Sequence, residues 1–269
     1  MVQVPEMFDL KGRVAVVTGA GSGLGKAYAH ALSAAGASVV CADIDQSAAH
    51  SCAASIQELD QQAWSVLLNV ADVLSVAQAI GETLDRFGRI DVLVNNAGVT
   101  SLPARAHEVS VADWDRVMTV NIRGMFACAR EVLPTMLQLG GGSIINIASV
   151  IGLVGVYPRF AVTGVPYASS KGAVIGFTKQ LAAEYAADGI RVNAIAPGWH
   201  GGTSLGKERR AKASQSDLQQ FESYIADSVP MARRGVPNEM DGLLVYLASD
   251  ASRYVTGQVI AHDGGLTAT

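Results

Sequence analysis

The chain has 269 residues, of which 49% are hydrophobic and 16% are charged, and its formal net charge at pH 7 is −4. This length and apolar content suit one large α/β domain or two small ones and argue against disorder. The negative net charge and the lack of a basic block also argue against nucleic acid or an anionic membrane as a main partner.

The beginning of the chain, MVQVPEMFDLKG, lacks the basic and apolar regions of a signal peptide. The longest apolar-rich stretch, residues 143–157, is too short and too polar to span a membrane. The three cysteines follow no metal-binding or redox spacing, which favours reduced thiols at Cys41, Cys52 and Cys128. We therefore expect a cytoplasmic protein.

Seven short apolar runs alternate with longer amphipathic segments such as residues 26–36 and 172–189. Each run ends in turn residues and suits a strand buried inside a parallel sheet. The predicted strands are residues 13–19, 38–44, 64–70, 90–98, 143–149, 190–198 and 258–265. This order predicts an α/β fold with a doubly wound, Rossmann-type parallel sheet of seven strands, in a single domain over residues 1–269. Ligands of such sheets bind beyond the carboxyl ends of the strands.

A glycine-rich turn, VVTGAGSGLGKAYA, follows the first predicted strand and opens the first helix. The glycines allow a tight turn and a close approach of phosphate, while the helix N-terminus supplies N–H donors. The residues expected to contact a dinucleotide are Gly19, Ser22, Gly23, Leu24 and Gly25 in this turn, and Asp43 and Ile44 at the end of the next strand. The alternative is a plain turn with no ligand.

Asp43, which ends the second predicted strand, indicates which dinucleotide binds. A carboxylate about 20 residues after the glycine turn can accept hydrogen bonds from both hydroxyls of the adenosine ribose. Its charge repels a 2′-phosphate, and neither Ile44 after it nor Ser22 in the turn supplies a compensating positive charge. The sequence therefore favours NAD over NADP as the cofactor. The neighbouring Asp45 reads as a helix cap.

Several ordered motifs make the chain resemble the short-chain dehydrogenase/reductase family. The resemblance extends from about residue 8 to the C-terminal YVTGQVIAHDGG. The motifs are TGAGSGLG, NNAG at 95–98, VNIRG around Asn121, INIAS ending at Ser149, YASSK beginning at Tyr167 and APG at 196–198.

The resemblance implies a catalytic tetrad of Asn121, Ser149, Tyr167 and Lys171. Tyr167 would be the general acid/base, and activity near neutral pH requires lowering its pKa from near 10 by roughly 3, about 4 kcal/mol. Lys171, four residues later on the same helix face, would hold the nicotinamide ribose and, together with the oxidised nicotinamide, lower that pKa. Ser149 would orient the substrate oxygen, and Asn121 would support a proton relay through water. Taken singly, each residue also fits a surface pair or a local backbone contact.

The same resemblance places further cofactor contacts along the strand ends. We expect Asn95 to stabilise the central sheet, whereas the next three residues permit close cofactor approach. Asn69 stands where the family usually has Asp, and Thr203 comes one position later than usual. Beside Tyr167 and Lys171, these contacts are Asn69, Val70, Asn96, Ala97, Gly98, Pro197, Gly198, His200 and Thr203. No other His or Cys has a spacing that joins His200, so we expect no metal site.

Two segments depart from the family pattern. The loop over residues 150–166 is longer than usual, and its Arg159 is either an anchor for an acidic substrate or a solvated loop charge. Residues 199–230 are expected to form a substrate-binding lid that orders on ligand binding. In this lid Trp199 either walls the cavity or packs in the core, and residues 207–212 form either a carboxylate site or a solvated helix face.

These features predict an NAD-dependent oxidoreductase that interconverts a small secondary alcohol and its ketone, with oxidation favoured. One alternative is a 3-oxoacyl-thioester reductase of the same family, and another is a dinucleotide-binding sensor without catalysis. The resemblance also implies a homotetramer, paired partly through the helices near residues 112–138 and 167–187. Sequence alone leaves the substrate open.

Overall fold

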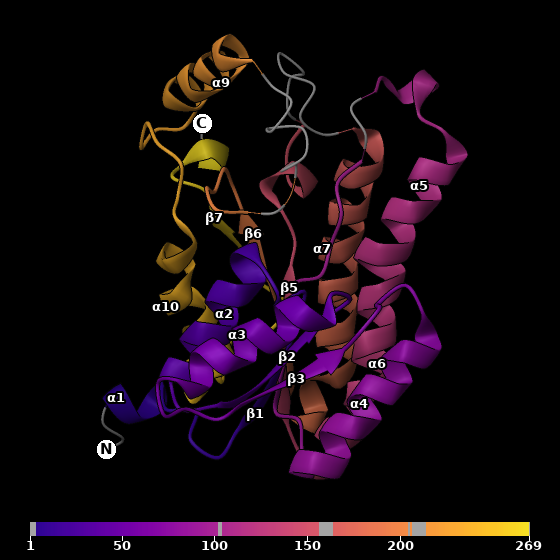
Figure 1. The fold of residues 1–269 in the computed structure, drawn as a ribbon, viewed down its shortest axis with the longest axis vertical. Helices are drawn as coiled ribbons and strands as arrows, with labels where there is room; N and C mark the ends of the chain where they lie inside the picture. The colour runs from indigo at the N-terminus through magenta and orange to yellow at the C-terminus, as the bar shows by residue number, and fades with distance from the viewer. Residues whose placement is uncertain (1–3, 102–103, 156–163, 204, 206–213, 269) are drawn as a thin grey trace.

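One sheet of seven parallel strands runs through the protein (Figure 1). The computed structural model describes residues 4–101, 104–155, 164–203, 205 and 214–268. The strands are β1 Val14–Thr18, β2 Ser38–Asp43, β3 Ala63–Leu67, β4 Val92–Asn95, β5 Gly142–Ile147, β6 Ile190–Pro197 and β7 Val259–His262. They lie in the order β3-β2-β1-β4-β5-β6-β7, and every neighbouring pair is parallel. The predicted α/β fold is confirmed, and each predicted run overlaps its strand, although β3 and β5 begin one residue earlier than predicted.

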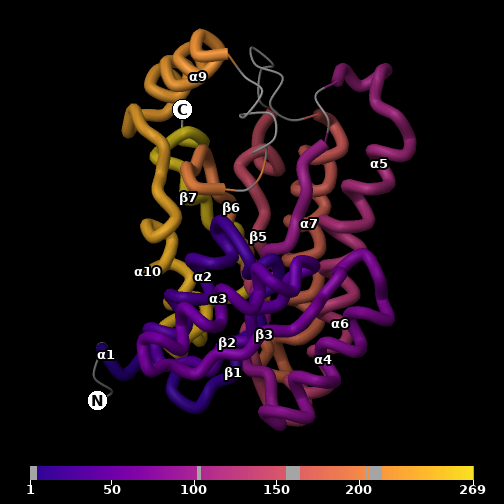
Figure 2. Tube along the Cα trace, viewed as in Figure 1, coloured from indigo at the N-terminus to yellow at the C-terminus, as the bar shows by residue number. Residues whose placement is uncertain are grey.

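Helices cover both faces of this sheet (Figures 1 and 2). The α-helices are α1 Val4–Met7, α2 Gly23–Ala34, α3 Gln46–Gln57, α4 Val73–Phe87, α5 Val111–Met118, α6 Gly124–Leu139, α7 Val165–Tyr185, α9 Gln215–Ser228 and α10 Asp241–Ala248. Shorter turns are η1 Ala106–Glu108, the π-helix η2 Thr119–Arg123, η3 Val150–Gly152, η4 Ala186–Asp188, η5 Pro237–Met240, η6 Asp250–Ser252 and η7 Leu266–Ala268. Among the described helices, none is long and apolar enough to cross a membrane.

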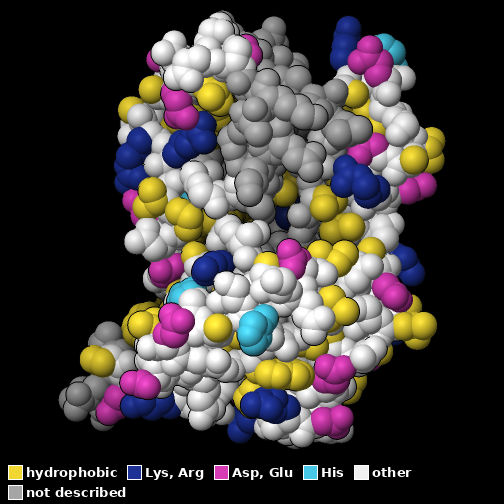
Figure 3. All heavy atoms as spheres, in the orientation of Figure 1, with side chains coloured by type: hydrophobic (Ala, Val, Ile, Leu, Met, Phe, Trp, Pro, Cys, Tyr) yellow, Lys and Arg dark blue, Asp and Glu magenta, His cyan; other side chains and the backbone are white. Residues whose placement is uncertain are grey.

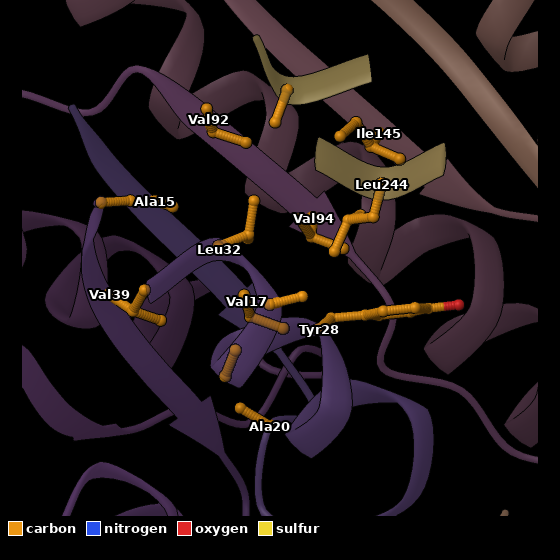
Figure 4. Close-up of a cluster of buried hydrophobic side chains, with 14 of the residues drawn as sticks. Ala15, Val17, Ala20, Tyr28, Leu32, Val39, Val92, Val94, Ile145 and Leu244 are labelled. Atoms are coloured by element: carbon orange, nitrogen blue, oxygen red, sulfur yellow. The ribbon is translucent and has the colours of Figure 1, made fainter. Parts of the chain in front are cut away.

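Each face of the sheet has its own hydrophobic core. On β1, Ala15 and Val17 pack with α2, α3 and α10, whereas Val14 and Val16 pack with α4, α6 and α7. Successive side chains of a strand point to opposite faces, so a strand covered on both sides reads as a continuous apolar run. In the first core, Tyr28 is fully buried and its hydroxyl lies 3.3 Å from the sulfur of Met240 (Figure 4). This packing fixes α2 and therefore the glycine turn that precedes it.

Side-chain caps determine where several helices begin. Asp45 accepts a hydrogen bond from the Ala48 N–H at the start of α3, as the sequence suggested, and Asp72 does the same for Leu74 at the start of α4. Such caps pair backbone donors that have no partner within the helix. Gly88 ends α4 with φ +70°, a left-handed conformation that glycine adopts without strain.

A buried chain of polar side chains joins the centre of the sheet to α7. The amide of Asn95 donates to the Asn146 Oδ1 at 3.0 Å, and the amide of Asn146 donates to the Thr178 hydroxyl at 3.0 Å. All three residues are buried. Because buried polar groups are stable only when paired, this chain fixes the register of β4, β5 and α7. The expectation that Asn95 serves the sheet fits this contact.

Cys41 on β2 and Cys52 on α3 lie together in the first core, although their spacing in the sequence suggested no pairing. Their sulfur atoms are 3.6 Å apart, and both cysteines are fully buried and free. A helix packed on the strand before it brings residues 11 positions apart into contact.

Candidate functional site

A cavity of about 700 Å³ opens beyond the carboxyl ends of the strands. Its walls come from the first turn of α2 and the ends of β2, β4, β5 and β6, together with α7 and α9. Of the residues predicted from sequence, it is lined by Gly19, Ser22, Leu24, Gly25, Asp43, Ile44, Asn69, Val70, Asn96, Ala97, Gly98, Ser149, Tyr167, Lys171, Pro197, Gly198, His200 and Thr203. Gly23 and Asn121 do not line it. Figure 1 shows α9 above the ends of β6 and β7, and Figure 3 shows the same face with its side chains.

The glycine turn brings backbone, rather than side chains, to the cavity wall. Gly19 has φ +69°, and a side chain on Gly25 would collide with the carbonyl oxygen of Gly19 and the amide of Asn96. That Asn96 amide donates to the Thr18 oxygen at 2.8 Å and the Gly19 oxygen at 3.2 Å. Gly23, with φ +56°, begins α2 without touching the cavity. The turn is thus a backbone cradle at a helix N-terminus, the surroundings that phosphate requires.

Asp43 stands at the end of β2 with both oxygens oriented by backbone. Its Oδ2 accepts from the Gly21 N–H at 2.8 Å, and its Oδ1 accepts from the Asp45 N–H at 3.0 Å. Among the described residues, no ion pair involves Asp43. Sequence reasoning missed Gly21, where a side chain would collide with Ala48 and with the Asp43 carboxylate. The carboxylate lines the cavity.

Tyr167 and Lys171 lie in the first two turns of α7, four residues apart on one helix face. Their exposed fractions are 6% and 4%, so neither is the solvated surface pair that the sequence left open. Ser149 begins η3 just after β5; its Oγ accepts from the Ile151 N–H at 3.3 Å and also shares a hydrogen bond with the Tyr167 hydroxyl. Three predicted tetrad residues therefore meet at one wall of the cavity.

Burial sets the proton affinities of this pair. It raises the pKa of Tyr167 to about 12, an effect that the Ser149 hydrogen bond opposes, and it lowers the pKa of Lys171 to about 8. The Lys171 Nζ donates to the Ile147 carbonyl oxygen at 2.6 Å and lies 5.7 Å from the centre of the Tyr167 ring. Desolvation thus shifts the Tyr167 pKa upward, the direction opposite to the one expected for a general base active near neutral pH.

Asn121 lies in the π-helix between α5 and α6, and its amide is fully engaged. The Oδ1 accepts from the Val99 N–H at 2.8 Å, while the Nδ2 donates to the Val99 oxygen at 2.9 Å and the Ser170 hydroxyl at 3.0 Å. The side chain therefore joins the chain after β4 to α7, which carries Tyr167. These two partners were not apparent from the sequence.

His200 has a neighbour that sequence spacing did not reveal. Its Nε2 lies 3.2 Å from the Nδ1 of His262, whose Nε2 contacts the Glu239 carbonyl oxygen at 3.0 Å. The two histidines are 62 positions apart, but β6 and β7 pair Pro197 with His262. Among the described residues, no group of three or more His, Cys, Asp or Glu side chains could hold a metal ion.

The end of the cavity beyond the tetrad has an aromatic wall. Trp199 lies edge-on to Phe221 of α9, with ring centres 5.5 Å apart, so Trp199 walls the cavity instead of packing in the core. Sequence reasoning missed Phe221, Leu218 and Arg234, which also line this end. Arg159, with the rest of residues 156–163 of the loop before Tyr167, and residues 207–212 lie outside the described residues.

Comparison with known proteins agrees with this site. A family model described as Enoyl-(Acyl carrier protein) reductase matches residues 19–267. The chain is 39% identical to the 3-oxoacyl-(acyl-carrier-protein) reductase FabG of Thermotoga maritima, over 96% of this chain and 98% of that one. It is 37% identical to the cis-4-hydroxycyclohexanecarboxylate dehydrogenase of Sinomonas cyclohexanicum, over 95% of this chain and 97% of that one.

A crystal structure shows the same fold. The gluconate 5-dehydrogenase from Burkholderia cenocepacia, solved in complex with NADP and tartrate, superposes with a TM-score of 0.90. The two sequences are 36% identical, and the match covers 99% of this chain and 100% of that one. These matches cover nearly the whole chain, and the site contains the glycine turn and the Ser–Tyr–Lys arrangement. The protein therefore belongs to the short-chain dehydrogenase/reductase family, oxidoreductases that act on alcohols and ketones with a nicotinamide dinucleotide.

Proposed function

We propose that this protein is an NAD-dependent dehydrogenase that interconverts a secondary alcohol and its ketone, with Tyr167 as the general acid/base. The observation that carries the proposal is the buried arrangement of Ser149, Tyr167 and Lys171 at the wall of a cavity that also contains a glycine cradle. Substrate and dinucleotide therefore have space in one cavity, next to a hydroxyl that can exchange a proton.

The residues of the cavity fit a nicotinamide dinucleotide. The backbone at Gly19 and Gly25 leaves space where a side chain would collide, which suits a pyrophosphate at the start of α2. The Asp43 carboxylate suits ribose hydroxyls and opposes a 2′-phosphate, which is why we infer NAD. The Burkholderia relative was solved with NADP, so that structure does not favour NAD. Our inference of an NAD preference for the present chain therefore depends on Asp43.

When bound, the oxidised cofactor supplies a hydride acceptor and a positive charge. The chain's own residues manage the proton and the orientation of the substrate. The Ser149 hydroxyl donates to the substrate oxygen, and Tyr167 accepts the proton that an alcohol loses on oxidation. Because Tyr167 is buried, a cation in the cavity stabilises its phenolate far more than it would in water. Lys171 holds ribose hydroxyls and carries the second charge.

The side-chain amide of Asn121 is occupied by Val99 and Ser170. We infer that this amide holds α7 in position and that any proton relay uses other atoms of this segment.

We also infer from the family resemblance that residues 1–269 form one domain, in which residues 199–230 are the substrate-binding lid. The residues of α9 that line the cavity support this lid.

A homotetramer is the assembly we infer for this chain. The described surface of α6 leaves three large apolar side chains 41–50% exposed, namely Phe126, Leu137 and Leu139. Large exposed apolar side chains on one helix are compatible with a subunit contact. Light scattering of the purified protein tests this directly, and a monomeric mass at micromolar concentration contradicts it.

The second candidate function is reduction of a 3-oxoacyl thioester, which the similarity to the Thermotoga FabG favours. One experiment separates the two: nicotinamide absorbance is followed with NAD, NADH, NADP and NADPH over secondary alcohols, ketones and a 3-oxoacyl thioester. We expect turnover of an alcohol with NAD. Turnover of the thioester with NADPH alone would replace the proposal with the reductase, and NAD binding without any turnover would favour a sensor.

A further inference from the structure

Two consecutive arginines, Arg233 and Arg234, follow α9, and the structure gives them different surroundings. Arg233 has a side chain that is 54% exposed, and its guanidinium donates to both carboxylate oxygens of Glu239 at 2.9 and 2.7 Å. Arg234 is only 22% exposed and lines the cavity. Dark blue Lys and Arg side chains are visible just below α9 (Figure 3). Of the pair, Arg234 is the one placed to meet a ligand.

The backbone beside Arg234 is joined to the chain that leaves β6. The N–H of Gly235 donates to the Trp199 oxygen at 2.9 Å, and the N–H of Gly201 donates to the Gly235 oxygen at 2.9 Å. The Arg234 guanidinium lies over the ring of Phe221, 4.8 Å from its centre, and its Nη2 pairs with the exposed Glu222 at 2.5 Å. The guanidinium is thus held in one orientation before any ligand arrives.

Two N–H donors at this end of the cavity have no acceptor. In the part of the chain that the structure describes, the Nε of Arg234 and the indole Nε1 of Trp199 are both buried without a hydrogen-bond partner. Both side chains contact Phe221: the Arg234 guanidinium lies over its ring, and the Trp199 indole makes a T-shaped contact with it. Neither group can accept a hydrogen bond, and a buried donor left unpaired is unfavourable. An acceptor on a ligand bound at this end would pair with them.

The charges nearby indicate which acceptor fits. The Nη2 of the guanidinium pairs with Glu222, and its Nε has no partner among the described residues. The carboxylate of Asp217, which also lines the cavity, already accepts from the backbone N–H and hydroxyl of Ser214. A planar carboxylate matches the remaining edge of a guanidinium and can take the indole N–H as well. Because the Arg234 guanidinium carries one charge and already pairs with Glu222, a singly charged carboxylate suits this site better than a doubly charged group. Leu218 and Phe221 supply an apolar wall for the body of the molecule.

We propose that Arg234, assisted by the Trp199 indole, anchors a carboxylate of the substrate, so that the substrates of this protein are hydroxy acids and the matching keto acids. The inference rests on the proposed function and adds the substrate class to it. Arg234 acts by binding, while the proton chemistry stays with Tyr167. Sequence reasoning had considered Arg159 and residues 207–212 for such an anchor, and Arg234 is a different residue.

The first test compares hydroxy acids of four to seven carbons with their neutral primary amides, using NAD and three variants. For wild type we expect the acid to have a kcat/KM about 10- to 100-fold above that of its amide, the range of a hydrogen bond to a charged group. Arg234→Met should remove this preference by raising KM for the acid far more than KM for the amide. Arg234→Lys should restore part of it, whereas Arg233→Met, the matched control, should retain all of it.

Glu222→Gln should have the opposite effect to Arg234→Met, and a purely structural role of Arg234 would not predict this effect. Removing the carboxylate that competes for the guanidinium should lower KM for the acid several-fold and leave KM for the amide unchanged. Two outcomes overturn the inference: Arg234→Met retains the acid preference, or it lowers turnover of acid and amide equally.

A binding measurement on the NAD-saturated protein keeps the inference testable if no panel compound turns over. Butyrate and cyclohexanecarboxylate should raise the Tm of wild type, while their amides and inorganic phosphate should not, and Arg234→Met should lose the shift. An absent shift with both carboxylates, or a shift with phosphate alone, overturns the carboxylate assignment. A carboxylate shift without turnover of any alcohol overturns the proposed function instead and leaves the anchor standing.

Discussion

The ammonium nitrogen of Lys171 lies 5.7 Å from the centre of the Tyr167 ring, with both side chains almost completely buried. Burial disfavours the charged form of each, so it raises the pKa of Tyr167 to about 12 and lowers that of Lys171 to about 8. Without a ligand, burial therefore disfavours the phenolate form of Tyr167. A cofactor that adds positive charge would oppose this bias, so the proposed acid/base function of Tyr167 would depend on cofactor binding.

The lowered pKa of Lys171 predicts how stability of the cofactor-free protein depends on pH. The unfolded lysine has a pKa of 10.5 and the folded one about 8, so between these values the unfolded chain binds more protons and stability rises with pH. Relative to Lys171→Met, wild type should gain about 2 kcal/mol of unfolding free energy from pH 7.5 to pH 10. Urea unfolding of both proteins measures this difference, and subtraction removes the contribution of the other groups. A difference that does not change with pH contradicts the burial of a charged Lys171.

Asp43 predicts the choice of dinucleotide. Asp43→Asn keeps the shape and the acceptor Oδ1 but removes the charge that repels a 2′-phosphate, so the NAD-to-NADP ratio of kcat/KM should fall about tenfold or more. Asp45→Asn is the matched control, because Asp45 caps α3 and does not line the cavity. An unchanged ratio in Asp43→Asn, or an NADP preference in wild type, means that the carboxylate does not set specificity.

The close approach of α2 to the first strand predicts that Gly25 tolerates no side chain. Gly25→Ala places a methyl group against the Gly19 carbonyl oxygen, so it should lower stability by about 1–3 kcal/mol and abolish saturable NADH binding. Gly81→Ala on α4 is the control: nothing lies within 4 Å of the added methyl, and helix propensity alone should stabilise it by up to about 1 kcal/mol. Thermal unfolding and NADH fluorescence check both, and normal NADH binding by Gly25→Ala refutes the cradle.

The fold could be predicted from sequence because its strands are buried on both faces and therefore read as uninterrupted apolar runs. The glycine turn and the four-residue spacing of Tyr167 and Lys171 are local patterns, so they too were visible. The pairing of His200 with His262 and the placement of Arg234 beside Trp199 depend on segments that only the folded sheet brings together. The degree of burial of Tyr167 is another property of packing, and so the direction of its pKa shift could not be read from the motif.

The most direct test of the account is turnover by Tyr167→Phe with NAD and the best alcohol substrate of wild type. The phenylalanine keeps the ring and removes only the hydroxyl that exchanges the proton. We predict that kcat falls by about 10²- to 10⁴-fold, the usual contribution of a general acid/base, while the Kd for NADH stays the same. Turnover close to that of wild type, with NADH still bound, would contradict the assignment of Tyr167 and with it the proposed mechanism.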